Sequence, residues 1–386
     1  MDSPFVYSRP VTGRGFIGRK TEVPILSNLL RDGENAVIYE PPKAGKDSLI
    51  QQVFYDMKLS GIQFGIASVS LASVRTMEDF CLRLGSAQLR LYAATTAEFA
   101  SLVGEMLGTT HFVFDPRQYE ETGSILSLGW DIDEEDIRAI ITLPYRLSRR
   151  AGRKLYVCID EFQDIMLIPE GERVCRIMQE VFKARSSDDR AWAGYILYGS
   201  QVNAMKEIFA RRKLFFRQVE RVEFTPVEAK DIADSVNRGF LTSGKVIDRN
   251  LLLGACQLFR CNIYYVNLFM SICDSLSKGY IMEPVLAEAL NRMLAIYEPH
   301  FKAVMSDLTT FQVSLLRAVV DGHVKFSAAE VIKRYSLNSS ANVRRLKDAL
   351  CKKEIITFEG DDDAPVIIDP LFEYWVRTAY FGIKPE

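Results

Sequence analysis

The sequence has few of the residues on which many enzyme sites depend. It contains only three histidines, His111, His300 and His323, and they lie far apart. The sequence therefore gives little support to a zinc site with histidine ligands or to a serine-hydrolase triad. The seven cysteines are odd in number, and no two have the spacing Cys-x-x-Cys. This usage fits reduced thiols in a cytoplasmic protein better than a disulfide framework.

Long hydrophobic runs and an excess of one charge are also missing. No apolar run is long enough to span a bilayer, and residues 1–10 have no signal-peptide core, so we expect no membrane association. The formal net charge of −2 gives no overall attraction to nucleic acid, and any basic surface must be local. The 386 residues have ordinary globular composition and are enough for two or three domains.

A strand, a loop and a helix are predicted in the order that a phosphate-binding loop requires. Residues 36–39 form a short apolar run, and residues 47–57 have helical spacing. The residues between them resemble the pattern of Gly, four residues, then Gly-Lys-Ser/Thr. Ser48 is expected to contact an α-phosphate. The loop residues that we expect to bind nucleotide are Pro41, Pro42, Lys43, Ala44, Gly45, Lys46, Asp47 and Ser48.

Two residues of this loop match the pattern and two depart from it. Gly45 can adopt the backbone shape that aims N–H groups at a phosphate, and Lys46 would reach the β- and γ-phosphates. Glu40 stands where the first glycine is expected. Asp47 stands where a Ser or Thr hydroxyl would bind Mg²⁺, and we expect it to be a direct oxygen ligand. Alternatively, the segment is only a polar turn in which Asp47 stabilises the first helical turn.

Two acidic residues end a second predicted strand. Residues 154–165 read as a buried-type strand that stops at Asp160 and Glu161. Because ligands of open α/β sheets bind at the carboxyl ends of strands, both acids are expected beside the loop. Asp160 would hold Mg²⁺ through a water, and Glu161 would orient or deprotonate the attacking water. The alternative is an acidic strand end that meets solvent.

The remaining strands define the fold class. Residues 194–201 read as another buried-type strand, which ends in Ser200 and Gln201. These two side chains would bond to a γ-phosphate or the water, or else form only a turn. Strands that alternate with helical segments predict an α/β fold with a parallel sheet sandwiched by helices. Residues 109–136 are acidic and irregular, and we interpret them as an exposed insertion.

Together these motifs resemble those of P-loop ATPases of the AAA+/STAND superclass, and most of all the archaeal-type ATPase group. The matching stretches are FIGR (16–19), IYEPPKAGKDSL (38–49), YVCIDEFQDI (156–165), LYGSQVNAMKEIF (197–209), KLFFRQVERVEFTPVE (213–228) and IIDPLFEYWVR (367–377). The resemblance implies ATP or ADP with Mg²⁺ as ligands. It also implies contacts of Gly18 and Arg19 at the adenine, and a finger or sensor role for Arg217. The alternative for Arg217 is a surface charge.

The resemblance divides the chain into a P-loop ATPase domain (1–225), a helical lid (226–303) and a C-terminal winged helix (304–386). Where the family has Gly-x-Pro near the start of a lid helix, this chain has Asn262 and Ile263. In the winged helix, Ser339 or Ser340 would cap a second helix whose apolar face contains Val343, Leu346 and Leu350. Basic residues lie off that face, namely Arg344, Arg345, Lys347, Lys352 and Lys353.

The basic helix leaves two kinds of partner open. It fits the recognition helix of a DNA-binding winged helix, which lies in the major groove. Winged helices also serve as protein-interaction modules. The hairpin after the helix carries acidic residues that would repel a phosphate backbone, namely Glu359, Asp361, Asp362 and Asp363.

Two functions are therefore compatible with the sequence. The first is an ATP-binding, slowly hydrolysing regulatory ATPase that acts as a nucleotide-dependent switch on a protein partner or through self-association. Its catalytic residues would be Lys46, Glu161, Ser200 and Arg217. The alternative is a non-hydrolysing DNA- or protein-binding adaptor with a degenerate nucleotide site.

Overall fold

The computed structural model describes residues 3–358 and 364–384. The chain divides into two compact units. The sheet unit contains Lys20–Glu40 and Leu49–Phe224, and the helical unit contains Met1–Arg19, Pro41–Ser48 and Thr225–Glu386. Within the described ranges, no helix is long and apolar enough to cross a membrane. The division into three domains that the sequence suggested stays a prediction.

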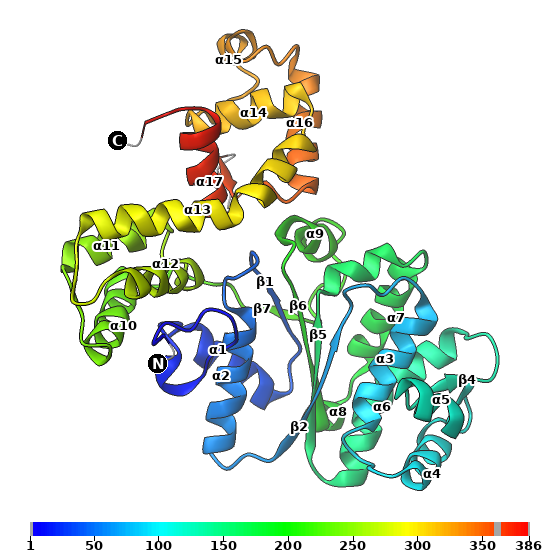
Figure 1. Cartoon of the computed structure of the whole chain (residues 1–386). Coiled ribbons are helices and arrows are strands. Elements are labelled where there is room, and N and C mark those ends of the chain that lie inside the picture. Colours follow the sequence, from blue (N-terminus) through cyan, green and yellow to red (C-terminus); the bar gives the residue numbers. More distant parts are fainter. Residues whose placement is uncertain (1–2, 359–363, 385–386) are drawn as a thin grey trace. The chain divides into compact units, whose positions relative to one another are not determined.

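The sheet unit is built on a five-stranded parallel sheet (Figure 1). Its strands, in spatial order, are β2 (Phe64–Ser70), β5 (Lys154–Asp160), β6 (Ala193–Gly199), β1 (Ala36–Tyr39) and β7 (Glu220–Arg221). Tyr39 at the end of β1 pairs with Gly199 at the end of β6. Ile159 of β5 pairs with Leu197 of β6. The carboxyl ends of these three strands therefore meet at one edge, and the predicted parallel α/β sheet is confirmed.

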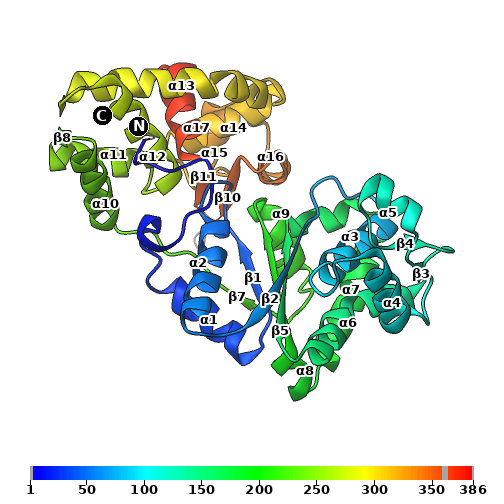
Figure 2. The ribbon, with the colours of Figure 1, turned by 60° about the horizontal axis from the view of Figure 1, so that its bottom comes forward.

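Helices cover both faces of this sheet (Figures 1 and 2). On one face lie α1 (Glu22–Asp32) and α2 (Lys46–Leu59), and on the other lie α3 (Met77–Leu89), α6 (Glu134–Ala151) and α7 (Gly171–Ala184). Side chains of β5 alternate between them, as strand geometry requires. The Tyr156 ring lies 5.5 Å from the Phe54 ring of α2, whereas Leu155 and Val157 are buried against the opposite helices.

Residues 109–136 are more ordered than the sequence suggested. They contain β3 (Phe112–Val113), α5 (Pro116–Thr122) and β4 (Ser127–Leu128), and the two strands pair antiparallel. Ile125 and Leu126 are fully buried. A Cβ atom at Gly85 of α3 would lie 2.3 Å from Leu126 Cδ1. The expectation of an irregular segment is wrong, because these residues form regular elements and part of their apolar surface packs into the core of the sheet unit. Other residues of the segment are exposed as expected, including Val113 and Trp130.

Further short elements complete the sheet unit. The helix α4 (Thr96–Leu107) precedes β3. The helix α8 (Ser187–Trp192) precedes β6, and α9 (Val202–Lys206) follows β6. A 3₁₀ helix, Phe162–Leu167, follows β5.

The helical unit consists mainly of α-helices around one apolar cluster. Its first helices are α10 (Ala229–Thr242), α11 (Arg249–Leu258), α12 (Ile263–Leu276) and α13 (Glu283–Ser306), with a short parallel pair of β8 (Val246–Ile247) and β9 (Tyr280–Ile281). The later elements are α14 (Thr310–Val320), α15 (Ala329–Arg334), α16 (Ser340–Lys352), β10 (Ile356–Phe358), β11 (Pro365–Ile367) and α17 (Pro370–Trp375).

The helix–turn–helix and hairpin expected near the C-terminus are present. Ser339 is the N-cap of α16, because its side chain accepts the N–H of Asn342. The apolar face is buried as expected at Val343, Leu346 and Leu350. The strands β10 and β11 pair antiparallel. The four acidic residues expected in the turn between them lie outside the described residues.

Candidate functional site

The loop after β1 has the backbone of a tight turn that leads into a helix. Lys43 and Gly45 both have left-handed backbone angles, with φ of 65° and 92°. The N–H of Ala44 donates to the carbonyl oxygen of Pro41 at 3.3 Å. The helix α2 then begins at Lys46. The first N–H groups of a helix lack partners in the helix and favour anions, so the loop can bind a phosphate group.

Two cationic side chains bond to the carbonyl oxygens of this loop. Lys46 is only 7% exposed, and its Nζ donates to the oxygen of Pro41 at 3.0 Å. Arg19 donates from Nη2 to Ala44 at 3.3 Å and from Nη1 to Thr225 at 2.6 Å. All three hydrogen bonds lie within the helical unit. Lys46 and Arg19 therefore stabilise the conformation of the loop and also bring positive charge to it.

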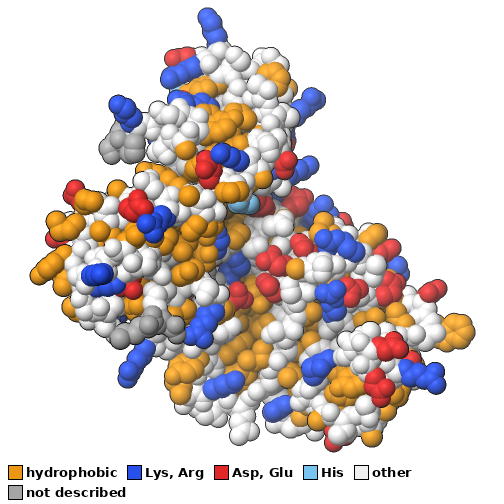
Figure 3. Space-filling view, viewed as in Figure 1, with side chains coloured by type: hydrophobic (Ala, Val, Ile, Leu, Met, Phe, Trp, Pro, Cys, Tyr) orange, Lys and Arg blue, Asp and Glu red, His pale blue; other side chains and the backbone are white. Residues whose placement is uncertain are grey.

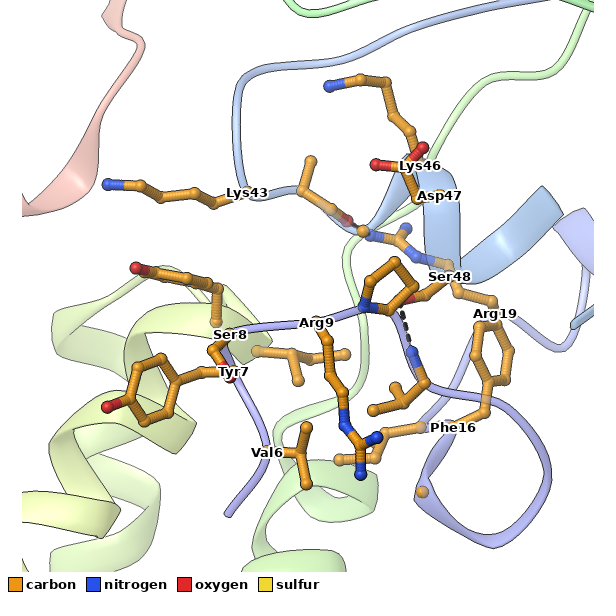
Figure 4. A pocket seen from close by; sticks show the side chains of 18 residues that line it. Val6, Tyr7, Ser8, Arg9, Phe16, Arg19, Lys43, Lys46, Asp47 and Ser48 are labelled. Atoms are coloured by element: carbon orange, nitrogen blue, oxygen red, sulfur yellow. Dashed lines mark hydrogen bonds between the residues drawn. The ribbon is translucent and has the colours of Figure 1, made fainter. Parts of the chain in front are cut away.

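A cavity of about 270 Å³ lies beside the loop within the helical unit (Figure 4). It is lined by residues 43–48 of the loop, by residues 6–11, 15–17 and 19 of the N-terminal segment, and by Ile263 and Tyr264 of α12. The Oγ of Ser48 accepts the N–H of Val11 at 3.2 Å. Because the hydroxyl accepts here, its hydrogen remains available to donate, for example to a phosphate oxygen.

The cavity includes most of the predicted nucleotide-binding residues. Arg19 and residues 43–48 line it, whereas Gly18, Pro41 and Pro42 do not. Gly18 instead has a structural reason to be glycine. Its φ is 68°, and a Cβ atom there would lie 2.6 Å from Val227 Cγ1.

The sequence did not reveal the other walls of the cavity. Residues 6–11 carry no motif, although Arg9-Pro10 is the kind of stiff segment that can form a fixed wall. Ile263 occupies the first helical position after Asn262, whose side chain accepts the N–H of Tyr265 at 3.2 Å. The apolar side chain of Ile263 lines the cavity.

The two departures from the phosphate-loop pattern have different surroundings. Glu40, in the sheet unit, accepts the N–H of Phe224 through Oε1 at 3.1 Å. This bond ties the end of β1 to the segment that follows β7. Asp47 is exposed on the first turn of α2, where a carboxylate is favoured by the helix dipole. Its oxygens are of the type that Mg²⁺ takes as ligands.

Three donors converge on one carboxylate oxygen of Glu161, in the sheet unit. Glu161 follows β5 with a left-handed φ of 49°. Its Oε2 accepts the hydroxyl of Ser200 at 2.8 Å, the N–H of Ser200 at 3.3 Å and Nε2 of Gln163 at 2.5 Å. Its Oε1 has no partner among the described residues. Asp160 accepts the N–H of Glu161 at 2.8 Å.

Gln163 belongs to this cluster, although no role for it was expected from the sequence. It is 4% exposed, and its Oε1 is buried without a partner in the described part of the chain. A Cβ atom at Gly199 would lie 2.1 Å from this oxygen, so the close packing requires glycine. Burial, and next the charge of Glu161, raise the pKa of the neighbouring Asp164. A further negative charge beside Glu161 and Asp164 is therefore unfavourable.

Arg217 is exposed and makes no ion pair with another described residue. It lies in the sheet unit with a φ of 61°. Its guanidinium carbon is 5.2 Å from the centroid of the Phe216 ring, which is itself 59% exposed. A role for Arg217 as a finger or sensor stays a prediction.

The order of the sheet, the loop after β1 and the C-terminal elements together define a P-loop NTPase fold with a helical region and a C-terminal winged helix. Residues 299–378 match a family described as a probable winged helix domain. No curated protein is similar enough in sequence to match the chain.

Two solved structures are similar over almost the whole chain. The Walker-type ATPase of Pyrococcus abyssi has a TM-score of 0.64 at 15% identity, and the similarity covers 97% of this chain and 99% of that one. The ORC2 protein of Aeropyrum pernix, solved in ADPNP–ADP complexes, has a TM-score of 0.55 at 13% identity and covers 96% and 97%. At these identities the likeness concerns the fold.

Proposed function

We propose that this protein binds ATP and ADP in the cavity beside the loop, and that the bound nucleotide sets the state of a regulatory switch. The observation that carries the proposal is the convergence of Lys46, the start of α2 and the Ser48 hydroxyl on one cavity. A cation, helix N–H groups and a hydroxyl donor are the groups that bind phosphates. The ADPNP–ADP complexes of the ORC2 protein support the proposal by analogy of fold.

The two departures from the loop pattern are compatible with this proposal. Glu40 has a partner in Phe224, so its negative charge is engaged by a backbone N–H group. Asp47 and Asp160 supply carboxylate oxygens with which the protein would hold Mg²⁺. Mg²⁺ would supply positive charge to the phosphates. The carboxylate in place of the usual hydroxyl at residue 47 favours slow turnover, because it brings a further negative charge to the site.

For hydrolysis we assign the water-orienting role to Glu161. With Oε2 held by three donors, Oε1 is the oxygen that can accept a proton or align a water. Ser200 then acts by positioning Glu161, in addition to any contact with phosphate. In this proposal the winged-helix region passes the nucleotide state to a protein partner or to a second copy of the chain.

Titration calorimetry with ATP, with and without Mg²⁺, tests the proposal. We expect Mg²⁺-dependent binding by the wild type and its loss in Lys46→Ala. The matched control is Lys58→Ala, which removes an exposed lysine from the last turn of the same helix. Glu161→Gln is expected to retain binding and lose turnover. Equal binding by the wild type and Lys46→Ala would contradict the proposal.

A second candidate function is DNA binding by α16, the helix predicted to be the recognition helix. Four basic side chains of this region are exposed and make no ion pair with another described residue, namely Arg344, Arg345, Lys352 and Lys353. Basic side chains also project from the surface over α14–α16 in Figure 3. These charges give the local basic surface that the net charge of the chain does not reveal.

A gel-shift titration at several salt concentrations tests this candidate. Replacing Arg344 and Arg345 by Ala is expected to weaken binding and to reduce the salt slope by about 1 per lost phosphate contact. Arg292→Ala is the control, because Arg292 is exposed but pairs with Glu288 in α13. No binding by the wild type at low salt would exclude the DNA candidate and leave the protein partner.

A further inference from the structure

Lys43 holds an unfavourable backbone conformation in the middle of the phosphate loop. Its φ of 65° lies in the left-handed region, which side chains with a Cβ atom avoid and glycine accepts. Such a residue persists only where its surroundings fix it, and such residues gather at ligand sites and switches. The contacts of the Lys43 side chain show what fixes it.

The side chain of Lys43 ends among three tyrosines of the helical unit. Its Nζ lies 4.4 Å from the ring centroid of Tyr297, 4.9 Å from that of Tyr265 and 5.0 Å from that of Tyr264. The same Nζ donates to the hydroxyl of Tyr265 at 3.1 Å. An ammonium this close to aromatic faces is attracted to them. Figure 4 shows that the side chain extends away from α2, where Lys46 and Asp47 lie.

The contact continues from Tyr265 into the region that matches the winged-helix family. The hydroxyl of Tyr265 donates to Oδ2 of Asp369 at 2.6 Å. The other oxygen of Asp369 accepts the N–H groups of Leu371 and Phe372 at 2.8 and 3.2 Å, which makes Asp369 the N-cap of α17. Burial lowers the pKa of Lys43, and the charge of Asp369 opposes this change. The carboxylate thus helps to keep the ammonium charged.

A second connection attaches the same part of the chain to the helices before it. Arg260 donates to the carbonyl oxygen of Ile367 at 2.7 Å and pairs with Glu373 of α17. The start of α17 is therefore fixed on both sides of Asp369. A residue held in this way can act as a firm anchor for the loop.

We propose that Asp369 is a positioning residue for nucleotide binding, and that it acts on the phosphate loop through Tyr265 and Lys43. This inference rests on the proposed function of the cavity. The anchor keeps Lys43 in the left-handed conformation, and the conformation aims the following N–H groups of the loop. By linkage, a partner that moves α17 changes the nucleotide affinity, and nucleotide changes the affinity for that partner by the same factor.

The cost of a left-handed residue sets the size of the effect. Without the anchor, Lys43 relaxes to a negative φ, and nucleotide binding must restore the unfavourable conformation. From that cost we expect binding to weaken by about 5- to 30-fold. Glycine at position 43 needs no anchor, because it adopts a positive φ freely. The effect of Asp369 is therefore expected to depend on the residue at position 43.

A double-mutant cycle on ATP affinity, measured by calorimetry on the full chain, tests the inference. Asp369→Asn keeps an oxygen for the N-cap, since Asn caps helices about as well as Asp. We expect it to weaken binding by about 5- to 30-fold in the wild-type background. Lys43→Gly is the second background of the cycle, and its own measured ATP affinity is the reference for that background. In the Lys43→Gly background, Asp369→Asn is expected to have no further effect.

The matched control is Asp248→Asn. Asp248 is also an N-cap in the helical unit, where it accepts the N–H of Asn250 at 2.8 Å, and it caps a different helix, α11. The Asp248→Asn variant should leave the ATP affinity unchanged. If Asp369→Asn does not fold, Tyr265→Phe breaks the same chain of contacts while keeping the ring, and Lys43→Gly should again remove its effect.

Each other outcome overturns the inference. Equal affinities of wild type and Asp369→Asn would overturn it and leave the proposed function standing. Equal weakening by Asp369→Asn in both backgrounds would mean that Asp369 acts by another route, and would also overturn it. No ATP binding by the wild type would overturn the proposed function and this inference together.

Discussion

The unpaired oxygen of Gln163 allows a quantitative test of the cluster around Glu161. We predict that Gln163→Met changes the free energy of unfolding by no more than about 2 kcal/mol. The replacement removes a hydrogen bond to a carboxylate, worth about 1.5–3 kcal/mol. It also removes a buried oxygen without a partner, which costs about 1–3 kcal/mol. Methionine is unbranched and fills irregular gaps, so the packing against Gly199 is retained.

The control variant is Gln163→Glu, which has nearly the same shape and adds a carboxylate. It places this charge beside Glu161 and Asp164, where burial and the charge of Glu161 already raise the pKa of Asp164. We expect Gln163→Glu to lower the free energy of unfolding by about 3 kcal/mol or more at neutral pH. The pKa of the new carboxyl at position 163 would be raised in the folded protein. Its destabilising effect is therefore expected to disappear as the pH falls toward about 4, the ordinary pKa of a Glu side chain, because the group is then protonated in both the folded and the unfolded state.

Urea unfolding of the wild type and both variants at two pH values measures these differences. The decisive comparison is between the two variants at neutral pH. A loss of about 3 kcal/mol or more in Gln163→Met would refute the reasoning, because it would mean that Oε1 of Gln163 does have a partner.

Two further predictions follow from single contacts. Glu40→Gly brings the loop closer to the phosphate-loop pattern, but it is expected to lower the free energy of unfolding by about 1–2 kcal/mol, because the N–H of Phe224 loses its acceptor. Glu40→Gln keeps an acceptor and should cost less in the same urea titration; equal costs would contradict this account. The hydrogen bond to Asp136 raises the pKa of His111, so the charged ring stabilises the fold below its unfolded pKa of about 6.5, and this stabilisation disappears as the pH rises through the raised value. His111→Asn is therefore expected to cost more stability at about pH 5 than at about pH 9, and a cost independent of pH would argue against the pairing.

The sequence by itself determined the features that depend on neighbouring residues. The apolar run of residues 36–39 became β1, and the helical spacing after it became α2. The residues ending in Asp160 became a strand of the parallel sheet, and Ser339 became the cap of α16. Hydrophobic periodicity and capping act over a few residues, so these features can be predicted without knowing the tertiary structure.

Only the tertiary structure decided which distant residues complete each site. Glu40 accepts the N–H of Phe224, which lies 184 positions further along the chain, and Lys43 donates to Tyr265, 222 positions away. No local pattern marks such a partner, because the contact exists only after the elements have packed. For the same reason, the sequence did not predict that residues 6–11, residues 15–17 and Ile263 line the cavity. The loop motif could be recognised in the sequence, whereas the residues that contact the loop could be identified only from the tertiary structure.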